Sequence, residues 1–362
     1  MKLVILVYDI HFGGGVERVT VNMSNHLVEI GYQVTILSLS RCKPSNLFTI
    51  DNRVTIDYLN FNFENGFNLP QKIASVNKVN RYFRKCTDRT IILGIGTTYP
   101  SLILALLFKR KNLITIGCQH CSYVSAKHIW YFLRNLIYYR LDALVSLTKQ
   151  DLPKLKNLNK NSFVIPNSVS FFPEKPAQLK NKIILAVGRM DFNKGYDLLL
   201  DVFEKITLSH PTWILRIIGD GPLREKIILR VEASGLKDRV VILSTTNQII
   251  HQYLQASVYM MTSRTEALPM VMLEAQACGL PIVSFNCETG PSDIINNGID
   301  GYLIDDYNID QMNLKVSELC ADFDKRKKFG QNARKNVEKF LPDQVFNKWE
   351  SLFAHLQTQN ED

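Results

Sequence analysis

The sequence has no hydrophobic run that is long and apolar enough to cross a membrane. Its longest uncharged stretch, residues 91–108, contains two Gly, two Thr, a Pro and a Ser, which favours a strand, a loop and a helix start. The apolar run at the N-terminus is short and is followed by Asp9 and His11 rather than by a cleavage site. We therefore expect a cytoplasmic protein that contacts membranes, if at all, only at their surface.

Signatures of several other protein classes are also missing. The seven cysteines are odd in number and form no paired framework, which is typical of a reducing compartment. Cys118 and Cys121 form a C-x-x-C without the second pair that a zinc site needs and without a thioredoxin-like context. The sequence has no fixed-period repeat and no G-x-G-x-x-G, so it supports neither a solenoid nor a dinucleotide-binding fingerprint.

Acidic residues are scarce in the first half of the chain. Residues 1–165 contain 21 Lys and Arg against 9 Asp and Glu, a net charge of +12, whereas residues 166–362 contain 22 against 25, a net charge of −3. Such one-sided basicity indicates an anionic partner, such as a membrane surface, a phosphorylated lipid or a nucleic acid, although a solvated basic face gives the same pattern. No recognised nucleic-acid-binding module accompanies the basic half, which disfavours nucleic acid.

Short runs rich in Val and Ile alternate with helical patterns, which predicts an α/β protein with parallel sheets covered on both faces. We expect strands at residues 2–8, 33–39, 91–95, 113–118, 143–148, 162–169, 183–189, 213–219, 240–244, 258–263 and 281–285. A polar segment with two prolines, residues 168–181, is predicted to be a linker. The chain is therefore predicted to form two doubly wound, Rossmann-like domains, residues 1–167 and 182–343, that face each other across a cleft.

Candidate ligand-binding residues follow the predicted strands, at the edge where doubly wound folds bind ligands. Residues 13–15 are three glycines between the first strand and a helix, where backbone N–H groups can approach an anion, although a plain tight turn explains them equally well. Arg189 ends a strand and Lys194 follows five residues later, and two such cations can neutralise a diphosphate without a metal. Gly221 lies in a glycine turn after the next strand.

Two glutamates mark the strongest candidate site. A helix start at Leu268 and Pro269 places Glu274 one turn inside a predicted helix at residues 270–278 and Glu266 in the loop before it. Glu274 is the only charge in MVMLEAQAC, which disfavours a solvated helix face and leaves a buried ion pair with Arg or Lys as the structural alternative. The pattern suits a nucleotide-sugar, with one carboxylate on sugar hydroxyls, the other on ribose, and helix N–H groups on phosphate.

These motifs together resemble those of the retaining glycosyltransferases with the GT-B fold, of the group-1 (family 4) type. The resemblance rests on GGGVER, on VGR followed by KG, on IIGDGP, and on the two glutamates within RTEALPMVMLEAQACGLPIVS. It is colinear from the first strand to about residue 304. Within the family, the sequence is most similar to bacterial enzymes that extend oligosaccharides on polyprenyl diphosphate for O-antigen, capsule or glycoprotein assembly. It departs at Ala267 and Ser168, where the family often has glycine.

The resemblance implies a role for each matching residue. Arg189 and Lys194 would hold the donor diphosphate and stabilise the leaving charge, and Glu266 would contact hydroxyls of the donor sugar. His120, at a strand end, matches a histidine beside the sugar, although a lone histidine is often structural. The implied catalytic residues are Glu266, Arg189, Lys194 and His120. The implied donor-binding residues are Gly14, Gly15, Arg189, Lys194, Gly221, Glu266, Met270, Val271 and Glu274, the last on the ribose. A C-terminal helix at about residues 344–358 would pack on the N-terminal domain.

We therefore predict a retaining, metal-independent glycosyltransferase in bacterial surface polysaccharide biosynthesis. It would move galactose or an N-acetylhexosamine from a UDP-sugar to a polyprenyl-diphosphate-linked oligosaccharide, without a cofactor. The Asp-x-Asp at Asp322 and Asp324 lies in a polar helical segment and does not predict a metal site. The basic half would contact the anionic inner face of the cytoplasmic membrane and not nucleic acid. The alternatives are a nucleotide-sugar epimerase or phosphorylase on the same fold, or a non-catalytic sugar-nucleotide-binding subunit of a glycan-assembly complex.

Overall fold

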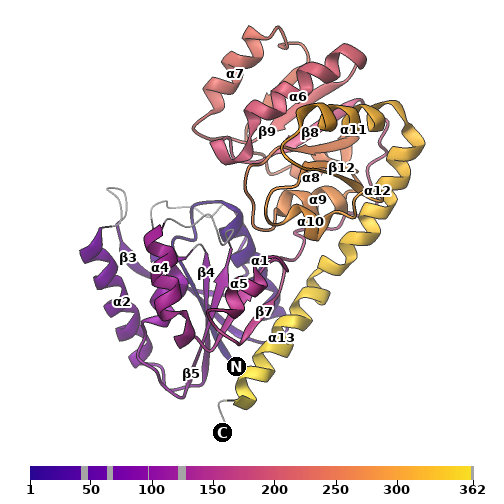
Figure 1. Ribbon diagram of the computed structural model, residues 1–362. Helices are drawn as coiled ribbons and strands as arrows, with labels where there is room; N and C mark the ends of the chain where they lie inside the picture. The colour runs from indigo at the N-terminus through magenta and orange to yellow at the C-terminus, as the bar shows by residue number, and fades with distance from the viewer. Residues whose placement is uncertain (42–47, 63–67, 97, 121–127, 360–362) are drawn as a thin grey trace. The chain divides into compact units, whose positions relative to one another are not determined.

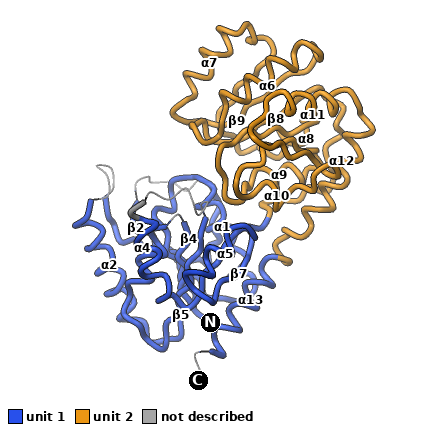
Figure 2. Tube along the Cα trace, in the orientation of Figure 1, with its two compact units in different colours: residues 1–168, 345–362 blue, residues 169–344 orange. Residues whose placement is uncertain are grey.

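The chain folds into two compact units (Figure 1 and Figure 2). The structure is a computed structural model and describes residues 1–41, 48–62, 68–96, 98–120 and 128–359. Unit 1 comprises Met1–Ser168 and Val345–Asp362, and unit 2 comprises Val169–Gln344. Most of the predicted linker, residues 168–181, therefore belongs to unit 2, where the amide of Ala177 donates to the carbonyl of Cys278 at 2.8 Å. Among the described residues, no helix combines the length and the apolarity needed to cross a membrane.

In the part of unit 1 that the structure describes, seven strands form a parallel sheet in the order β3-β2-β1-β4-β5-β6-β7. Its strands are β1 (Lys2–Val7), β2 (Gln33–Ser40), β3 (Thr55–Phe61), β4 (Thr90–Gly96), β5 (Leu113–Gln119), β6 (Ala143–Ser146) and β7 (Ser162–Val164). The continuous apolar run of β1 serves two cores, because Leu3 and Ile5 point into one and Val4 and Leu6 into the other.

Helices cover both faces of this sheet, as Figure 1 shows. They are α1 (Gly15–Glu29), α2 (Leu69–Arg84), α3 (Tyr99–Ala105), α4 (His128–Ile137), the 3-10 turn η2 (Tyr138–Arg140) and α5 (Leu152–Lys156). Helix α1 packs in the core that contains Leu3, through Val21 and Leu27. Helices α2, α3 and α5 pack in the core that contains Val4. The sheet is therefore buried on both sides, as its apolar strands require.

Helix α13 (Pro342–Gln359) returns the end of the chain to unit 1. This is the segment that the family resemblance assigns to the N-terminal domain. Phe346, Trp349 and Phe353 are buried in the core that also contains Leu3. The ring of His26, from α1, stacks on Phe346 with centroids 4.0 Å apart. The apolar face of α13 thus completes one side of the unit 1 sheet.

Unit 2 contains a parallel sheet of six strands in the order β10-β9-β8-β11-β12-β13. Its strands are β8 (Ile183–Val187), β9 (Ile214–Ile218), β10 (Val240–Leu243), β11 (Val258–Met261), β12 (Ile282–Phe285) and β13 (Gly301–Ile304). Its helices are α6 (Tyr196–Ser209), α7 (Arg224–Ala233), α8 (Ile249–Gln255), α9 (Met270–Ala277), α10 (Pro291–Ile294), α11 (Ile309–Ala321) and α12 (Phe323–Val337), with 3-10 turns η3 (Phe192–Lys194) and η4 (Glu338–Phe340). Asp322, of the Asp-x-Asp sequence, caps α12 by accepting from the amide of Lys325 at 2.9 Å.

The predicted α/β architecture is confirmed, but two strands were not predicted. Strand β3 is the outer strand beside β2, and β13 is the outer strand beside β12. An outer strand has less of its surface buried than a central one, so its sequence needs no continuous apolar run. Strand β3 alternates polar and apolar residues, and β13 has four residues and begins with glycine. Neither pattern stands out from a loop in the sequence alone.

Candidate functional site

The candidate site of unit 2 lies where its strand connections diverge. Strand β8 has β9 on one side and β11 on the other, so the gap between β8 and β11 is the topological switch point of the sheet. Doubly wound sheets bind ligands at the carboxyl ends of the strands at this point. Arg189 and Lys194 follow β8, and Glu266 follows β11. The strand order therefore brings together segments that are far apart in the sequence.

Lys194 and Glu266 form an ion pair at this switch point. Lys194 ends the turn η3, and the Asp191 carboxylate holds that turn by accepting from the amides of Asn193 and Lys194. The Lys194 Nζ lies 2.6 Å from Oε1 of Glu266. The Glu266 side chain is 9% exposed and that of Lys194 is 27% exposed. Because an ammonium has three N–H donors, an anion entering from the open side can share Lys194 with Glu266.

Arg189 lies at the same strand end but is open to solvent. Its side chain is 73% exposed, and its Nε lies 3.9 Å from Oδ2 of Asp191. This distance is too long for a hydrogen bond, so the planar guanidinium retains its bidentate donors for a ligand. Arg189 and Lys194 thus follow one strand, with Lys194 already oriented by Glu266.

Arg264 connects the turn that carries Lys194 to the loop that carries Glu266. Its guanidinium donates to both carboxylate oxygens of Asp197, at 2.9 and 2.6 Å, and to the carbonyl of Phe192 at 2.9 Å. It also stacks over the Phe192 ring at 4.3 Å, and its hydrogen bond lowers the pKa of Asp197. Sequence reasoning missed this residue. Its signal was a second charge in the RTE segment, but its partners Phe192, in the turn after β8, and Asp197, in α6, could not be inferred from spacing.

A glycine turn after β9 closes against the loop that follows β8. The amide of Met190 donates to the carbonyl of Asp220 at 2.9 Å. Gly221 has a φ of 159°, and a Cβ there would lie 2.5 Å from the carbonyl oxygen of Met190. Only glycine allows this approach without displacing the Met190 backbone. Gly221 therefore shapes the edge beside Arg189 through its backbone.

Helix α9 points its first turn toward the same edge. Met270 and Val271 begin the helix after Pro269, which has no side-chain acceptor for their N–H groups. Glu274 is fully buried one turn further, and the hydroxyl of Tyr253 donates to its Oε2 at 3.0 Å. Burial and the nearby carboxylate raise the pKa of Tyr253 well above its ordinary value. The predicted ribose contact of Glu274 stays a prediction, and Tyr253 is a partner that the sequence did not indicate.

The three candidates in unit 1 lie at the carboxyl edge of its sheet. His120 follows β5, and its amide donates to the carbonyl of Gly96 at 3.0 Å. Burial lowers the pKa of the His120 imidazole to about 4, so the ring is neutral at neutral pH. The amide of Gly14 donates to Glu17 Oε2 at 2.8 Å, so the Glu17 carboxylate satisfies one backbone N–H group at the start of α1. Gly15 opens that helix, with free space where a Cβ would stand.

Neither the cysteines nor any other cluster identifies a metal site in the described part of the chain. No group of three or more His, Cys, Asp or Glu side chains is placed there to hold a metal ion. Cys118 is buried, and burial raises the pKa of its thiol. Cys121, its partner in the C-x-x-C, lies outside the described residues.

Comparisons with known proteins agree on one family. The models for glycosyl transferases group 1 and glycosyltransferase family 4 match residues 169–336 and 13–171. The chain is 30% identical to the amylovoran biosynthesis glycosyltransferase AmsD of Erwinia amylovora, over 97% of this chain and 99% of AmsD. It is 25% identical to the Campylobacter jejuni GalNAc-alpha-(1->4)-GalNAc-alpha-(1->3)-diNAcBac-PP-undecaprenol alpha-1,4-N-acetyl-D-galactosaminyltransferase, over 98% of this chain and 99% of that enzyme. The S. aureus TarM G117R structure with fondaparinux, alpha-GlcNAc-glycerol and UDP is similar in fold, with a TM-score of 0.82 and 17% identity over 97% of this chain and 99% of TarM.

The chain has the GT-B fold, because it consists of two Rossmann-like units with parallel sheets and matches the TarM structure over nearly its whole length. The chain belongs to the group 1 glycosyltransferases, with an N-terminal half of the family 4 type. The family prediction made from the motifs around Arg189, Glu266 and Glu274 is confirmed.

Proposed function

We propose that this glycosyltransferase moves a sugar from a UDP-sugar to a polyprenyl-diphosphate-linked saccharide during bacterial surface polysaccharide biosynthesis. The observation that carries the proposal is the Lys194–Glu266 ion pair at the unit 2 switch point, 2.6 Å long, with Arg189 exposed beside it. Cations paired with a carboxylate suit a ligand that combines a diphosphate with sugar hydroxyls. The names of two similar proteins support the acceptor class. AmsD is named as a glycosyltransferase of amylovoran biosynthesis, and the name of the C. jejuni enzyme gives a PP-undecaprenol saccharide. Galactose or an N-acetylhexosamine is the proposed sugar.

The proposed reaction retains the anomeric configuration and needs no metal. The bond between the anomeric carbon and the diphosphate oxygen breaks, and an acceptor hydroxyl forms its bond on the same face of the sugar. The departing diphosphate takes the proton of that hydroxyl. Arg189 and Lys194 stabilise the charge that develops on the diphosphate, and Glu266 holds sugar hydroxyls. Catalysis then comes mainly from positioning and from charge stabilisation at the leaving group.

Unit 1 has the acceptor role in this proposal. The family resemblance assigns His120 to the sugar and Gly14 and Gly15 to the donor diphosphate, and these assignments stay predictions. The excess of positive charge in residues 1–165, +12, suits a lipid diphosphate and the anionic inner face of the cytoplasmic membrane. The enzyme would then work in the cytoplasm at the membrane surface.

A transfer assay tests the proposal. Purified protein is incubated with a panel of UDP-sugars and GDP-sugars in EDTA, with and without polyprenyl-diphosphate-linked saccharide. We expect transfer from one UDP-sugar, with the anomeric configuration retained in the product, and loss of transfer in Glu266→Ala. The matched control is Glu232→Ala, which removes an exposed carboxylate from α7.

Three other outcomes would overturn parts of the proposal. Conversion of the donor to an epimer without acceptor would indicate an epimerase. Donor binding without turnover on any acceptor would indicate an accessory subunit. Transfer that stops in EDTA and returns with a divalent cation would contradict metal independence.

A further inference from the structure

The outer face of helix α4 carries large apolar side chains, although its inner face already contributes to the core. Trp130, Leu133 and Ile137 pack against the buried cluster of unit 1. Phe132, Leu136 and Tyr139, the last in η2, are between 56% and 67% exposed. Their spacing of four and three residues places them in one stripe on the outside of the helix. A helix that is apolar on both faces usually has a partner on each.

Helix α2 lies beside α4 and extends this apolar surface. The Lys72 Nζ lies over the Trp130 ring at 4.7 Å, and Tyr99 bridges the two helices through a hydrogen bond to Ser75 and an edge contact with Trp130. On the outside of α2, Leu69 and Ile73 are exposed. Two neighbouring helices therefore present apolar side chains to solvent.

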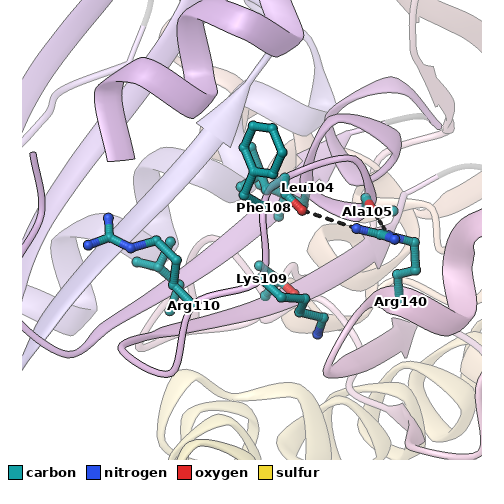
Figure 3. Close-up of a pocket in the computed structure, with 9 residues that line it drawn as sticks. Leu104, Ala105, Phe108, Lys109, Arg110 and Arg140 are labelled. Carbon is teal, nitrogen blue, oxygen red and sulfur yellow. Dashed lines mark hydrogen bonds between the residues drawn. The ribbon is translucent and has the colours of Figure 1, made fainter. Parts of the chain in front are cut away.

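The segment between α3 and β5 continues the same surface. The Arg84 guanidinium, at the end of α2, lies over the Phe108 ring at 5.7 Å. From the other side, Arg140 in η2 donates through Nε to the carbonyl of Ala105 at 2.8 Å, beside a pocket that Phe108 and Lys109 also line (Figure 3). We call the combined surface the docking face. Its exposed apolar residues are Leu69, Ile73, Leu106, Phe108, Phe132, Leu136 and Tyr139.

The docking face lies in a part of the chain that is almost free of acidic residues. Residues 69–140 contain twelve Lys and Arg and a single acid, Asp88. Exposed cations flank the apolar residues on α2 and before β5, namely Lys78, Arg81, Arg84, Lys85 and Lys111, whereas Lys109 is paired with Asp142 at 2.7 Å. Apolar side chains surrounded by cations match the boundary between lipid headgroups and acyl chains of an anionic bilayer. A second copy of this chain is a poor match, because it would bring two such basic surfaces together.

We infer that the docking face holds unit 1 on an anionic phospholipid surface. Phe132, Leu136 and Tyr139 enter the boundary between headgroups and acyl chains, and the flanking cations meet lipid phosphates. Leu69 lies at the N-terminal end of α2, near the carboxyl edge of the sheet, because α2 runs back toward the start of β4. One end of the docking face therefore lies at the edge that carries His120. The inference deepens the proposed function, since a lipid-linked acceptor would lie in the same bilayer.

Co-sedimentation with vesicles tests the docking face without any donor or acceptor. The full chain is mixed with phosphatidylcholine vesicles with and without phosphatidylglycerol, at low and at high salt. We expect binding that depends on phosphatidylglycerol, weakens with salt and leaves a salt-resistant fraction. The variant F132S/L136S should lose that fraction, with a partition coefficient lower by roughly a hundredfold, about tenfold for each apolar side chain. R84Q/K85Q should lower low-salt binding by about fivefold for each charge.

Matched controls lie in unit 2. L208S/L229S removes leucines that are 85% and 63% exposed, and K327Q/K328Q removes two exposed cations. Both controls should bind vesicles like the unaltered protein. Equal binding of F132S/L136S and the unaltered protein would overturn the inference. A dimer in sedimentation equilibrium that F132S/L136S dissociates, with no vesicle binding, would instead assign the face to a second copy of the chain.

A second assay separates this inference from the proposed function. F132S/L136S should transfer sugar to a short-chain, water-soluble acceptor at an unchanged rate, and lose transfer to a long-chain acceptor in vesicles. Vesicle binding without transfer to either acceptor would leave the docking face in place and overturn the proposed reaction. Transfer to both acceptors without vesicle binding would support the proposed reaction and overturn the docking face.

Discussion

Replacing Lys194 with methionine removes the cation that lies 2.6 Å from the Glu266 carboxylate. The Glu266 side chain is 9% exposed, so the remaining carboxylate would be largely cut off from water. Breaking a fully buried ion pair by removing one partner costs about 3–5 kcal/mol, and the partial exposure of Lys194 reduces this to about 2 kcal/mol. We expect Glu266→Gln to cost less, because the ammonium left behind is the more exposed partner.

The double variant K194M/E266Q distinguishes the effect of the unpaired charge from the effect of lost packing. With both charges removed, no unpaired charge stays at the edge, so the loss should be about 1 kcal/mol rather than the sum of the two single losses. Urea unfolding of the four proteins gives the coupling free energy directly. Losses that add to within about 0.5 kcal/mol would refute the reasoning. The double variant should still lack transferase activity, which shows that recovered stability does not restore the site.

Three further predictions concern Tyr253, His120 and Arg264. Tyr253→Phe removes a donor to the buried Glu274 carboxylate and should cost about 1–3 kcal/mol in thermal unfolding, with weaker UDP binding if Glu274 holds the ribose. His120, with its pKa lowered to about 4, binds its proton more weakly in the folded than in the unfolded state. The stability that the neutral His120 ring contributes should therefore be complete near neutral pH and be lost as the pH falls from about 6.5 to about 4. Urea unfolding at a series of pH values measures this loss, which should be absent in His120→Asn. Arg264→Gln releases the turn that carries Lys194 and should lower the transfer rate by about tenfold to a hundredfold with little change in stability, whereas an unchanged rate would contradict its positioning role.

Much of the fold could be predicted because the central strands are buried on both faces and therefore read as continuous apolar runs. The outer strands β3 and β13 were missed because one side of each has no neighbouring strand and their patterns are weaker. The predicted start of α9 agreed with the structure to the residue, since a proline before an apolar helical run is a strong local signal.

Contacts within the site were harder to predict, because they depend on strand order. Lys194 meets Glu266 only because β8 lies next to β11, and the sequence does not say which strands are neighbours. The same reason hid Arg264, whose partner Asp197 belongs to α6. Tyr253 reaches Glu274 from a different helix, α8, and no sequence spacing indicates that contact.

Calorimetric titration with UDP tests the central claim most directly, namely that the unit 2 switch point holds the donor diphosphate. The informative variant is Arg189→Gln, because the Arg189 side chain is 73% exposed and its loss should leave the fold unchanged. Lys237→Gln is the matched control, since it removes one exposed cation that precedes β10, at the opposite edge of the same sheet. We predict that Arg189→Gln weakens UDP binding by roughly tenfold or more and that Lys237→Gln does not. Equal UDP affinity in Arg189→Gln and the unaltered protein would contradict the claim and place the donor diphosphate elsewhere.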